Sequence, residues 1–172
     1  LAKNKYSIRN FAIGGIVMIN LLELIEDERK KGYSEANAGA KVCQDLLLKA
    51  ISDSTLSRNV TIKGGVVMRS KTNNIRRATQ DLDIDFIKYS LSDSSIDLFI
   101  EKVNNIDGIK FIRIGNIEEL NQQDYHGKRV LIKIIDMTGY ELISKIDLGV
   151  HKKFEIHQEE YCFDISFTDD GA

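Results

Sequence analysis

Apolar residues recur at every third or fourth position in three parts of the chain, and this spacing predicts three helices. The first covers 16–31 and ends at Gly32, because glycine commonly terminates helices. The second runs from Ser34 to about residue 52, and the third covers 93–104 after Ser92. Serine at these two positions is suited to accept a hydrogen bond from the first helical turn.

Other segments alternate apolar and polar residues, or place a short apolar run between turn residues, and they predict strands. The predicted strands cover 60–63, 81–89, 109–115, 128–136, 140–150 and 161–167. A tight turn at 137–139 joins two of them, so that pair should be antiparallel. Helices precede and interrupt a run of strands, which predicts an α+β fold with a mixed β-sheet and its helices gathered on one side.

The composition is that of an ordinary globular protein, with 24 basic and 26 acidic residues and a formal net charge of −2. Bulk charge therefore does not indicate a strongly basic nucleic-acid binder. No signal peptide is predicted, and the longest apolar stretch, 11–22, is too short to span a bilayer, so we expect no membrane association. Cys43 and Cys162 lack metal-type spacing, and we expect buried thiols in a reducing cytoplasm.

Candidate chemistry is concentrated in the strand predicted to begin at Asp81. Its alternation places three large apolar residues on one face and Asp81, Asp83 and Asp85 on the other. Carboxylates from Asp81 and Asp83 can converge on one divalent ion, and Mg²⁺ takes few carboxylates while keeping positions for water and substrate phosphates. Such a site stabilises an in-line displacement at phosphorus. The competing interpretation is an exposed edge strand whose acids serve solubility.

A pair of glycines, Gly64 and Gly65, follows the predicted strand 60–63. Glycine lets backbone N–H groups approach a phosphate closely, and a helix beginning there would add its positive N-terminal dipole. Arg69 would lie about one turn into that helix, near the same anion. Taken alone, two glycines after a strand also suit a plain tight turn.

A third acid is expected on a neighbouring strand, and two aspartates compete for this role. Asp147 lies within the apolar strand 140–150, where an idle surface charge is not expected. Asp136 ends its strand beside a turn, where aspartate is common for turn reasons. Lys145 should share the face of Asp147. Arg77, just before the acidic strand, is a candidate contact for phosphate or nucleic acid. The alternative is that Arg77 is a solvated charge in a loop.

Two motifs together resemble the nucleotidyltransferase signature of the DNA polymerase β-like superfamily: Gly64-Gly65-Val66-Val67-Met68-Arg69 and Thr79-Gln80-Asp81-Leu82-Asp83. More narrowly, Lys63-Gly64-Gly65, Arg69 and the run from Arg77 to Asp83 resemble the AbiEii family of abortive-infection and type IV toxin–antitoxin toxins.

The resemblance implies a nucleotidyltransferase-like mixed β-sheet flanked by helices. It implies Asp81, Asp83 and Asp147 as catalytic metal ligands, and a nucleotide site at Gly64 and Gly65 with assistance from Arg69. It further implies a nucleoside triphosphate substrate, Mg²⁺, transfer to the acceptor end of tRNA and a cognate antitoxin.

The expected organisation is one nucleotidyltransferase core domain over 1–172. Residues 1–58 would form a helical N-terminal part, 59–150 the catalytic sheet and 151–172 a tail. Members of the family usually continue beyond the third acid into a helical region that 151–172 does not predict, so we expect the chain to be truncated at its C-terminus. Two other functions remain open: a nucleotide- or partner-binding module with a degenerate fold, and an aminoglycoside-type nucleotidyltransferase.

Overall fold

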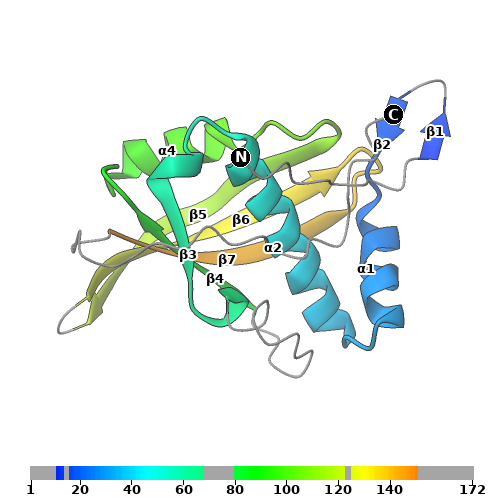
Figure 1. The fold of residues 1–172 in the computed structure, drawn as a ribbon, viewed down its shortest axis with the longest axis horizontal. Coiled ribbons are helices and arrows are strands. Elements are labelled where there is room, and N and C mark those ends of the chain that lie inside the picture. The colour runs from blue at the N-terminus through cyan, green and yellow to red at the C-terminus, as the bar shows by residue number, and fades with distance from the viewer. Residues whose placement is uncertain (1–10, 14–15, 68–79, 123–124, 151–172) are drawn as a thin grey trace.

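A computed structural model describes residues 11–13, 16–67, 80–122 and 125–150 of the chain (Figure 1). Two short strands come first, followed by two helices, a 3₁₀ turn and a sheet that is interrupted by one further helix. In chain order the elements are β1 Phe11–Ile13, β2 Ile16–Met18, α1 Leu21–Lys30, α2 Glu35–Asp53, η1 Ser57–Asn59, β3 Val60–Lys63, β4 Asp81–Phe86, α4 Asp93–Lys102, β5 Ile109–Gln122, β6 Tyr125–Asp136 and β7 Glu141–Val150.

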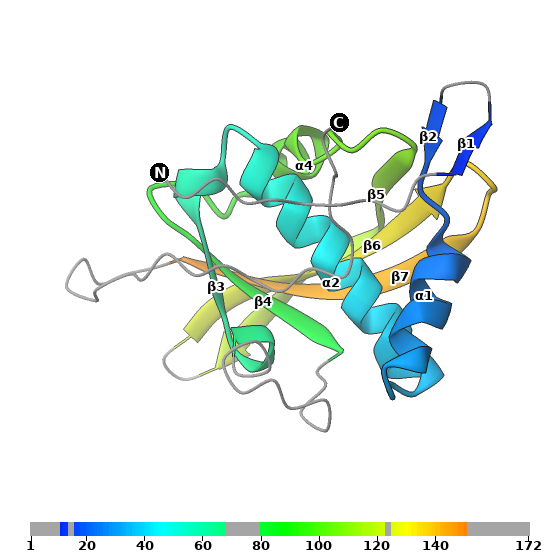
Figure 2. The same cartoon turned by 45° about the vertical axis from the view of Figure 1, so that its right-hand side comes forward.

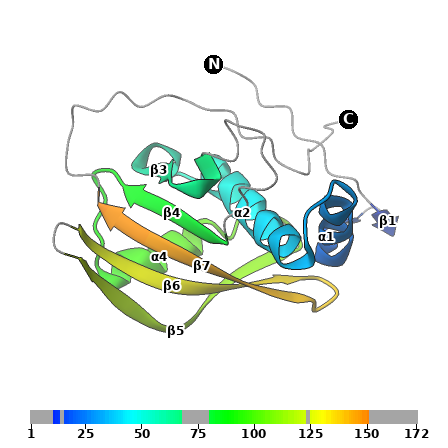
Figure 3. The same cartoon turned by 90° about the horizontal axis from the view of Figure 1, so that it is seen from below.

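Five strands form one mixed sheet in the order β3-β4-β7-β6-β5. The β4–β7 pair is parallel, whereas β3–β4, β7–β6 and β6–β5 are antiparallel. Figure 3 shows β4, β7, β6 and β5 side by side, with α4 behind them. The structure therefore confirms the predicted α+β layout, and it confirms the antiparallel pair around the 137–139 turn as β6 and β7.

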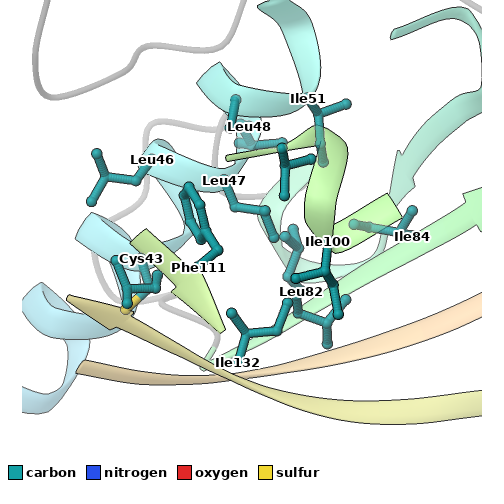
Figure 4. Close-up of a cluster of buried hydrophobic side chains, with 14 of the residues drawn as sticks. Cys43, Leu46, Leu47, Leu48, Ile51, Leu82, Ile84, Ile100, Phe111 and Ile132 are labelled. Carbon is teal, nitrogen blue, oxygen red and sulfur yellow. The ribbon is translucent and has the colours of Figure 1, made fainter. Parts of the chain in front are cut away.

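Helices α2 and α4 cover one face of this sheet. Figures 1 and 2 show α2 lying across the strands with α1 alongside it. Leu46 and Leu47 of α2, Ile100 of α4, Leu82 of β4 and Ile132 of β6 belong to one buried apolar cluster, which Figure 4 shows in close-up. Because burial of apolar surface is the main favourable term in folding, this contact fixes which face of the sheet is left for polar side chains.

The predicted caps are confirmed at two helices. The hydroxyl of Ser34 accepts a hydrogen bond from the backbone N–H of Asn37, and that of Ser92 accepts one from Ser95. Each bond satisfies one donor that the first helical turn leaves without an intrahelical partner. Helix α2 thus begins where the sequence predicted.

The prediction of a helix over 16–31 was wrong in its first turn. Ile16–Met18 instead pairs antiparallel with Phe11–Ile13, so 1–58 is not helical throughout, and α1 begins at Leu21 after Asn20, whose side chain accepts from the N–H of Glu23. Short apolar runs fit a strand or a helix equally well, and here strand pairing decides.

Strands β5 and β6 are also longer than the predicted strands 109–115 and 128–136, because they continue into the polar residues between them and pair as far as Gln122 with Tyr125. The strand predicted at 161–167 lies outside the described residues. Within the described part of the chain, no helix is both long and apolar enough to cross a membrane.

Candidate active site

The acidic residues of β4 lie on the sheet face opposite the helices. Leu82 and Ile84, which alternate with them, are fully buried in the core, whereas Asp81, Asp83 and Asp85 are half-buried on the other face. The strand is not an edge strand, since β3 pairs with it on one side and β7 on the other. Interpreting the acids as solubilising charges on an exposed edge is therefore not supported.

Asp147 lies on the same face, on the neighbouring strand. In the parallel pairing of β4 with β7, Asp83 is directly opposite Asp147 and Asp81 is opposite Lys145. Residues that face each other across neighbouring strands have side chains on the same side of the sheet. The register thus brings together the three carboxylates that the sequence singled out.

Asp136, the rival candidate, serves a different purpose at the end of β6. It is buried, and its carboxylate accepts hydrogen bonds from the backbone N–H of Leu21 at 2.9 Å, Thr138 at 2.9 Å and Tyr140 at 3.1 Å. The carboxylate therefore closes the β6–β7 turn and caps α1 at the same time. Asp136 therefore has a structural role at the end of β6, whereas Asp147 shares the face of Asp81 and Asp83.

Three of the four acids on this face are held by a cation from an adjacent position. Lys63 Nζ lies 2.6 Å from Asp85, Lys145 Nζ lies 3.0 Å from Asp81, and Arg129 contacts Asp147. The arginine contact is bidentate: Nε donates to Oδ1 at 2.7 Å and Nη2 donates to Oδ2 at 2.8 Å.

Asp83 differs from its neighbours, because no ion pair to it is found within the described residues. Burial raises the pKa of Asp83 above its ordinary value, and the negative charge of Asp147 raises it further, while Lys63 opposes the shift. The hydrogen bond to Asp147 raises the pKa of Arg129, so the arginine stays charged. Among the described residues, Asp81, Asp85 and Asp147 thus have a cationic partner, and Asp83 has none.

Gly64 packs directly against this carboxylate. Its φ of +74° is in the left-handed region, and a Cβ at this position would overlap Asp83 Oδ2 and lie 3.1 Å from Asp83 Cγ. Both facts favour glycine at this position. The chain is helical at 65–67 immediately afterwards, as the sequence predicted for the start of that turn, so the loop delivers a helix N-terminus next to Asp83.

The acidic side chains of this face are not arranged as a complete metal-binding site. Among the described residues, no three carboxylate, histidine or cysteine side chains are gathered closely enough to hold a metal ion. Asp81 and Asp147 each form an ion pair, with Lys145 and Arg129 respectively. The residue types suit a hard divalent cation, since Asp81, Asp83 and Asp147 lie on one face and Asp83 has no ion-pair partner within the part of the chain that the structure describes.

A comparison with protein-family models identifies the family. The model described as nucleotidyl transferase AbiEii toxin of type IV toxin–antitoxin systems matches residues 46–168. The chain belongs to this family. The match covers most of the chain and includes Gly64, Gly65 and all four acids of the face. A search of curated proteins found no significant match.

Membership of the AbiEii family confirms the resemblance on which the sequence-based prediction rested, and it identifies the protein as a nucleotidyltransferase-type toxin of a toxin–antitoxin system. The roles predicted for Asp81, Asp83, Asp147, Gly64 and Gly65 stay predictions. Arg69 and Arg77, the two arginines expected at the nucleotide, lie outside the described residues.

Sequence reasoning missed Arg129. The alternation of β6 places it on the face opposite Val130 and Ile132, which was visible in the sequence. Its pairing with Asp147, however, depends on the register of the β6–β7 hairpin. A count back from the 137–139 turn could have found this partner, because a tight turn fixes the register of the strands it joins.

Proposed function

We propose that this AbiEii-family protein transfers a nucleoside monophosphate from a nucleoside triphosphate to an acceptor hydroxyl of RNA, with tRNA as the expected acceptor, and that it requires Mg²⁺. The observation that carries the proposal is the register of β4 with β7, which sets Asp147 opposite Asp83 on the face that also bears Asp81. Family membership supports the reaction class. The carboxylates on one face of the sheet support the proposed requirement for Mg²⁺.

The carboxylates fit a divalent ion in chemistry as well as in position. Burial and the charge of Asp147 make an ionised Asp83 costly, and a bound dication would remove that cost. Asp83, with Asp81 and Asp147 beside it, would hold the ion, which supplies charge stabilisation at the phosphoryl oxygens and lowers the pKa of the attacking hydroxyl.

Lys145 has a second use in this scheme. It pairs with Asp81 across the β4–β7 register. If Asp81 turns toward the ion, the ammonium group is left on the same face beside the acids, where it can contact a phosphate oxygen of the substrate.

The loop after β3 is the proposed triphosphate site. Gly64 brings the backbone against Asp83, and the chain is helical from Gly65 to residue 67, so this loop would offer backbone N–H groups to a phosphate. A phosphate bound there would lie next to the carboxylates. Arg69 and Arg77 are proposed to assist from the sequence motif.

One observation favours a second candidate, a module that binds nucleotide without turnover. Asp81 and Asp147 are engaged by protein cations, and a degenerate site could keep them so permanently. Such a protein would bind a nucleoside triphosphate but release no pyrophosphate, which makes the two candidates separable in one assay.

The test incubates the full chain with each α-³²P-labelled nucleoside triphosphate, Mg²⁺ and total cellular RNA, with Asp83→Asn as the control. We expect labelled RNA in the size range of tRNA with at least one nucleotide, and none with the variant. Nucleotide binding by the wild type without label transfer or pyrophosphate release under any of these conditions would favour the binding module instead.

A further inference from the structure

The sheet face that carries the acids also carries exposed apolar side chains. Ile143 is 62% exposed and Leu131 is 36% exposed. Burial alternates along β6, with Val130, Ile132 and Ile134 in the core, so the residues between them lie on the face opposite the helices. Cross-strand pairing extends this surface to both neighbouring strands. The β5–β7 surface, as it is called below, consists of Lys110, Ile112 and Ile114 of β5, Leu131 and Lys133 of β6, and Ile143 of β7.

The β5–β7 surface begins directly beside the acids. Asp81 of β4 is opposite Lys145 of β7, and Lys145 is in turn opposite Leu131 of β6. Figure 3 shows these strands side by side. Neighbouring strands are about 4.8 Å apart, so the backbone of Leu131 lies roughly 10 Å from that of Asp81. A molecule bound on this surface would therefore reach the acids without a gap.

The proposed triphosphate site determines the side from which an acceptor approaches. In an in-line displacement, the attacking and leaving oxygens lie on opposite sides of the phosphorus. The acceptor oxygen bonds to the α-phosphorus, the bond from phosphorus to the pyrophosphate oxygen breaks, and the hydroxyl proton is lost to solvent. The loop at Gly64 follows the edge strand β3, so pyrophosphate would leave on the β3 side of the acids. The acceptor hydroxyl then arrives from the other side, over β7 and β6.

We infer that the β5–β7 surface binds the single-stranded end of the acceptor RNA, with bases against its apolar residues and phosphates at its lysines; this rests on the proposed function. Lys110 is exposed and forms no ion pair within the described residues. Lys133 lies 2.9 Å from Glu141. Because a partly exposed ion pair contributes little stability, a phosphate can compete with Glu141 for this lysine.

The chemistry of the surface favours RNA over a second copy of the chain. The bases of a single strand are accessible and have apolar faces, whereas a duplex hides them. A specific protein interface covers about 800 Å² on each partner. An interface of that size centred on Leu131 would extend over Lys145 and Asp81, and it would close the face on which the proposed reaction takes place.

The apolar part of the surface is tested with Ile143→Ser, with Leu98→Ser as the matched control. Leu98 is 43% exposed on α4, on the other side of the sheet. The measurement is the affinity of the full chain for a short fluorescent single-stranded RNA of mixed sequence, followed by fluorescence anisotropy. We expect Ile143→Ser to bind roughly tenfold more weakly than wild type and Leu98→Ser to bind like wild type. A blunt duplex of the same sequence should bind more weakly than the single strand.

The charged part of the surface is tested with Lys110→Gln, with Lys102→Gln as the control. Lys102 is exposed on α4, where it donates a hydrogen bond to Thr55. One phosphate contact contributes about 0.7 to the slope of log affinity against log salt for a single strand, so Lys110→Gln should lower the slope by about that amount. Lys102→Gln should leave it unchanged. In the transfer assay, Lys110→Gln and Ile143→Ser should raise the KM for RNA and leave the KM for the nucleotide unchanged.

The inference is overturned if wild type binds the RNA while Ile143→Ser and Lys110→Gln bind it as tightly as their controls. It is also overturned if wild type sediments as a dimer without RNA and Ile143→Ser dissociates that dimer, because the surface would then join two copies of the chain. A wild-type protein that neither binds nor labels RNA would remove the RNA acceptor of the proposed function together with this inference. Labelling of RNA by wild type and by both variants with equal KM would remove the inference alone.

Discussion

Replacing Gly64 with alanine adds one methyl group at the point where the loop after β3 touches Asp83. The new Cβ would overlap Asp83 Oδ2, and it would lie 3.1 Å from Asp83 Cγ and 3.4 Å from Asp83 Cβ. The methyl group is fixed to the backbone, whereas the carboxylate can rotate. We therefore expect the protein to fold with the Asp83 carboxylate displaced.

Two separate costs follow from the structure. The φ of +74° strains any residue that has a Cβ, so Gly64→Ala should lower the free energy of unfolding by about 1–2 kcal/mol. Clearing the overlap moves the carboxylate by about 1 Å, and a misplacement of that size in a catalytic site costs roughly 10²-fold in rate. The first cost concerns folding and the second concerns the metal site.

Gly115→Ala separates the two costs. Gly115 has a φ of +67°, close to that of Gly64, and a Cβ there would meet nothing within 4 Å. Both variants should lose similar thermal stability. The loss of nucleotide transfer, and of affinity for Mn²⁺ used as a paramagnetic substitute for Mg²⁺, should be confined to Gly64→Ala. Equal Mn²⁺ affinity in the two folded variants would refute the argument that Gly64 is required by the position of Asp83.

Three further outcomes are expected. Asp83→Asn should abolish transfer yet raise the melting temperature of the metal-free protein at neutral pH. Because the pKa of Asp83 is raised in the folded protein, folding becomes less favourable as pH rises from below the ordinary value of 3.8 through the folded pKa. The gain in stability of Asp83→Asn over wild type should therefore vanish at acidic pH. Thermal melts at several pH values with and without Mg²⁺ would show the opposite trend if the carboxylate stabilised the fold. Asp136→Ala should lower the free energy of unfolding by about 1–3 kcal/mol, because the buried N–H of Leu21 loses its hydrogen-bond partner. Its Mn²⁺ affinity should equal that of wild type. A weaker affinity in the folded variant would indicate that Asp136 is a metal ligand. In a Cys162→Ser background, Cys43, whose pKa burial raises to about 12, should react with iodoacetamide at pH 8 only after denaturation, and rapid labelling of the native protein would contradict the burial of α2.

Local patterns predicted the elements of the site well, because each was decided by neighbouring residues. The alternation in β4 followed from burial on one face alone, and the caps at Ser34 and Ser92 need only the next helical turn. The turn at 137–139 gave the antiparallel β6–β7 pair. In each case the competing conformations lose a hydrogen bond or expose apolar surface within a few residues.

The features that the sequence did not predict depend on pairing between segments or residues outside the local pattern. Ile16–Met18 continues the apolar spacing of the predicted helix, but it pairs with Phe11–Ile13. Asp136 suits its turn by composition, and its bond to Leu21, 115 positions away, emerges only when α1 is packed against the end of β6. The β5–β6 hairpin extends through polar residues that lay outside the predicted strands 109–115 and 128–136.

The ion pairs on the sheet face opposite the helices distinguish the acids that stabilise the fold from the acid that is proposed to serve catalysis. Within the described ranges, Asp81, Asp85 and Asp147 each pair with a cation, which offsets part of the cost of burying their charge. Asp83 instead lies beside Asp147 and against the backbone of a left-handed glycine, and its raised pKa records the cost. Strained or poorly stabilised groups persist where function requires them. Asp83 is therefore the residue of this face that the fold least explains and that a bound dication would most directly stabilise.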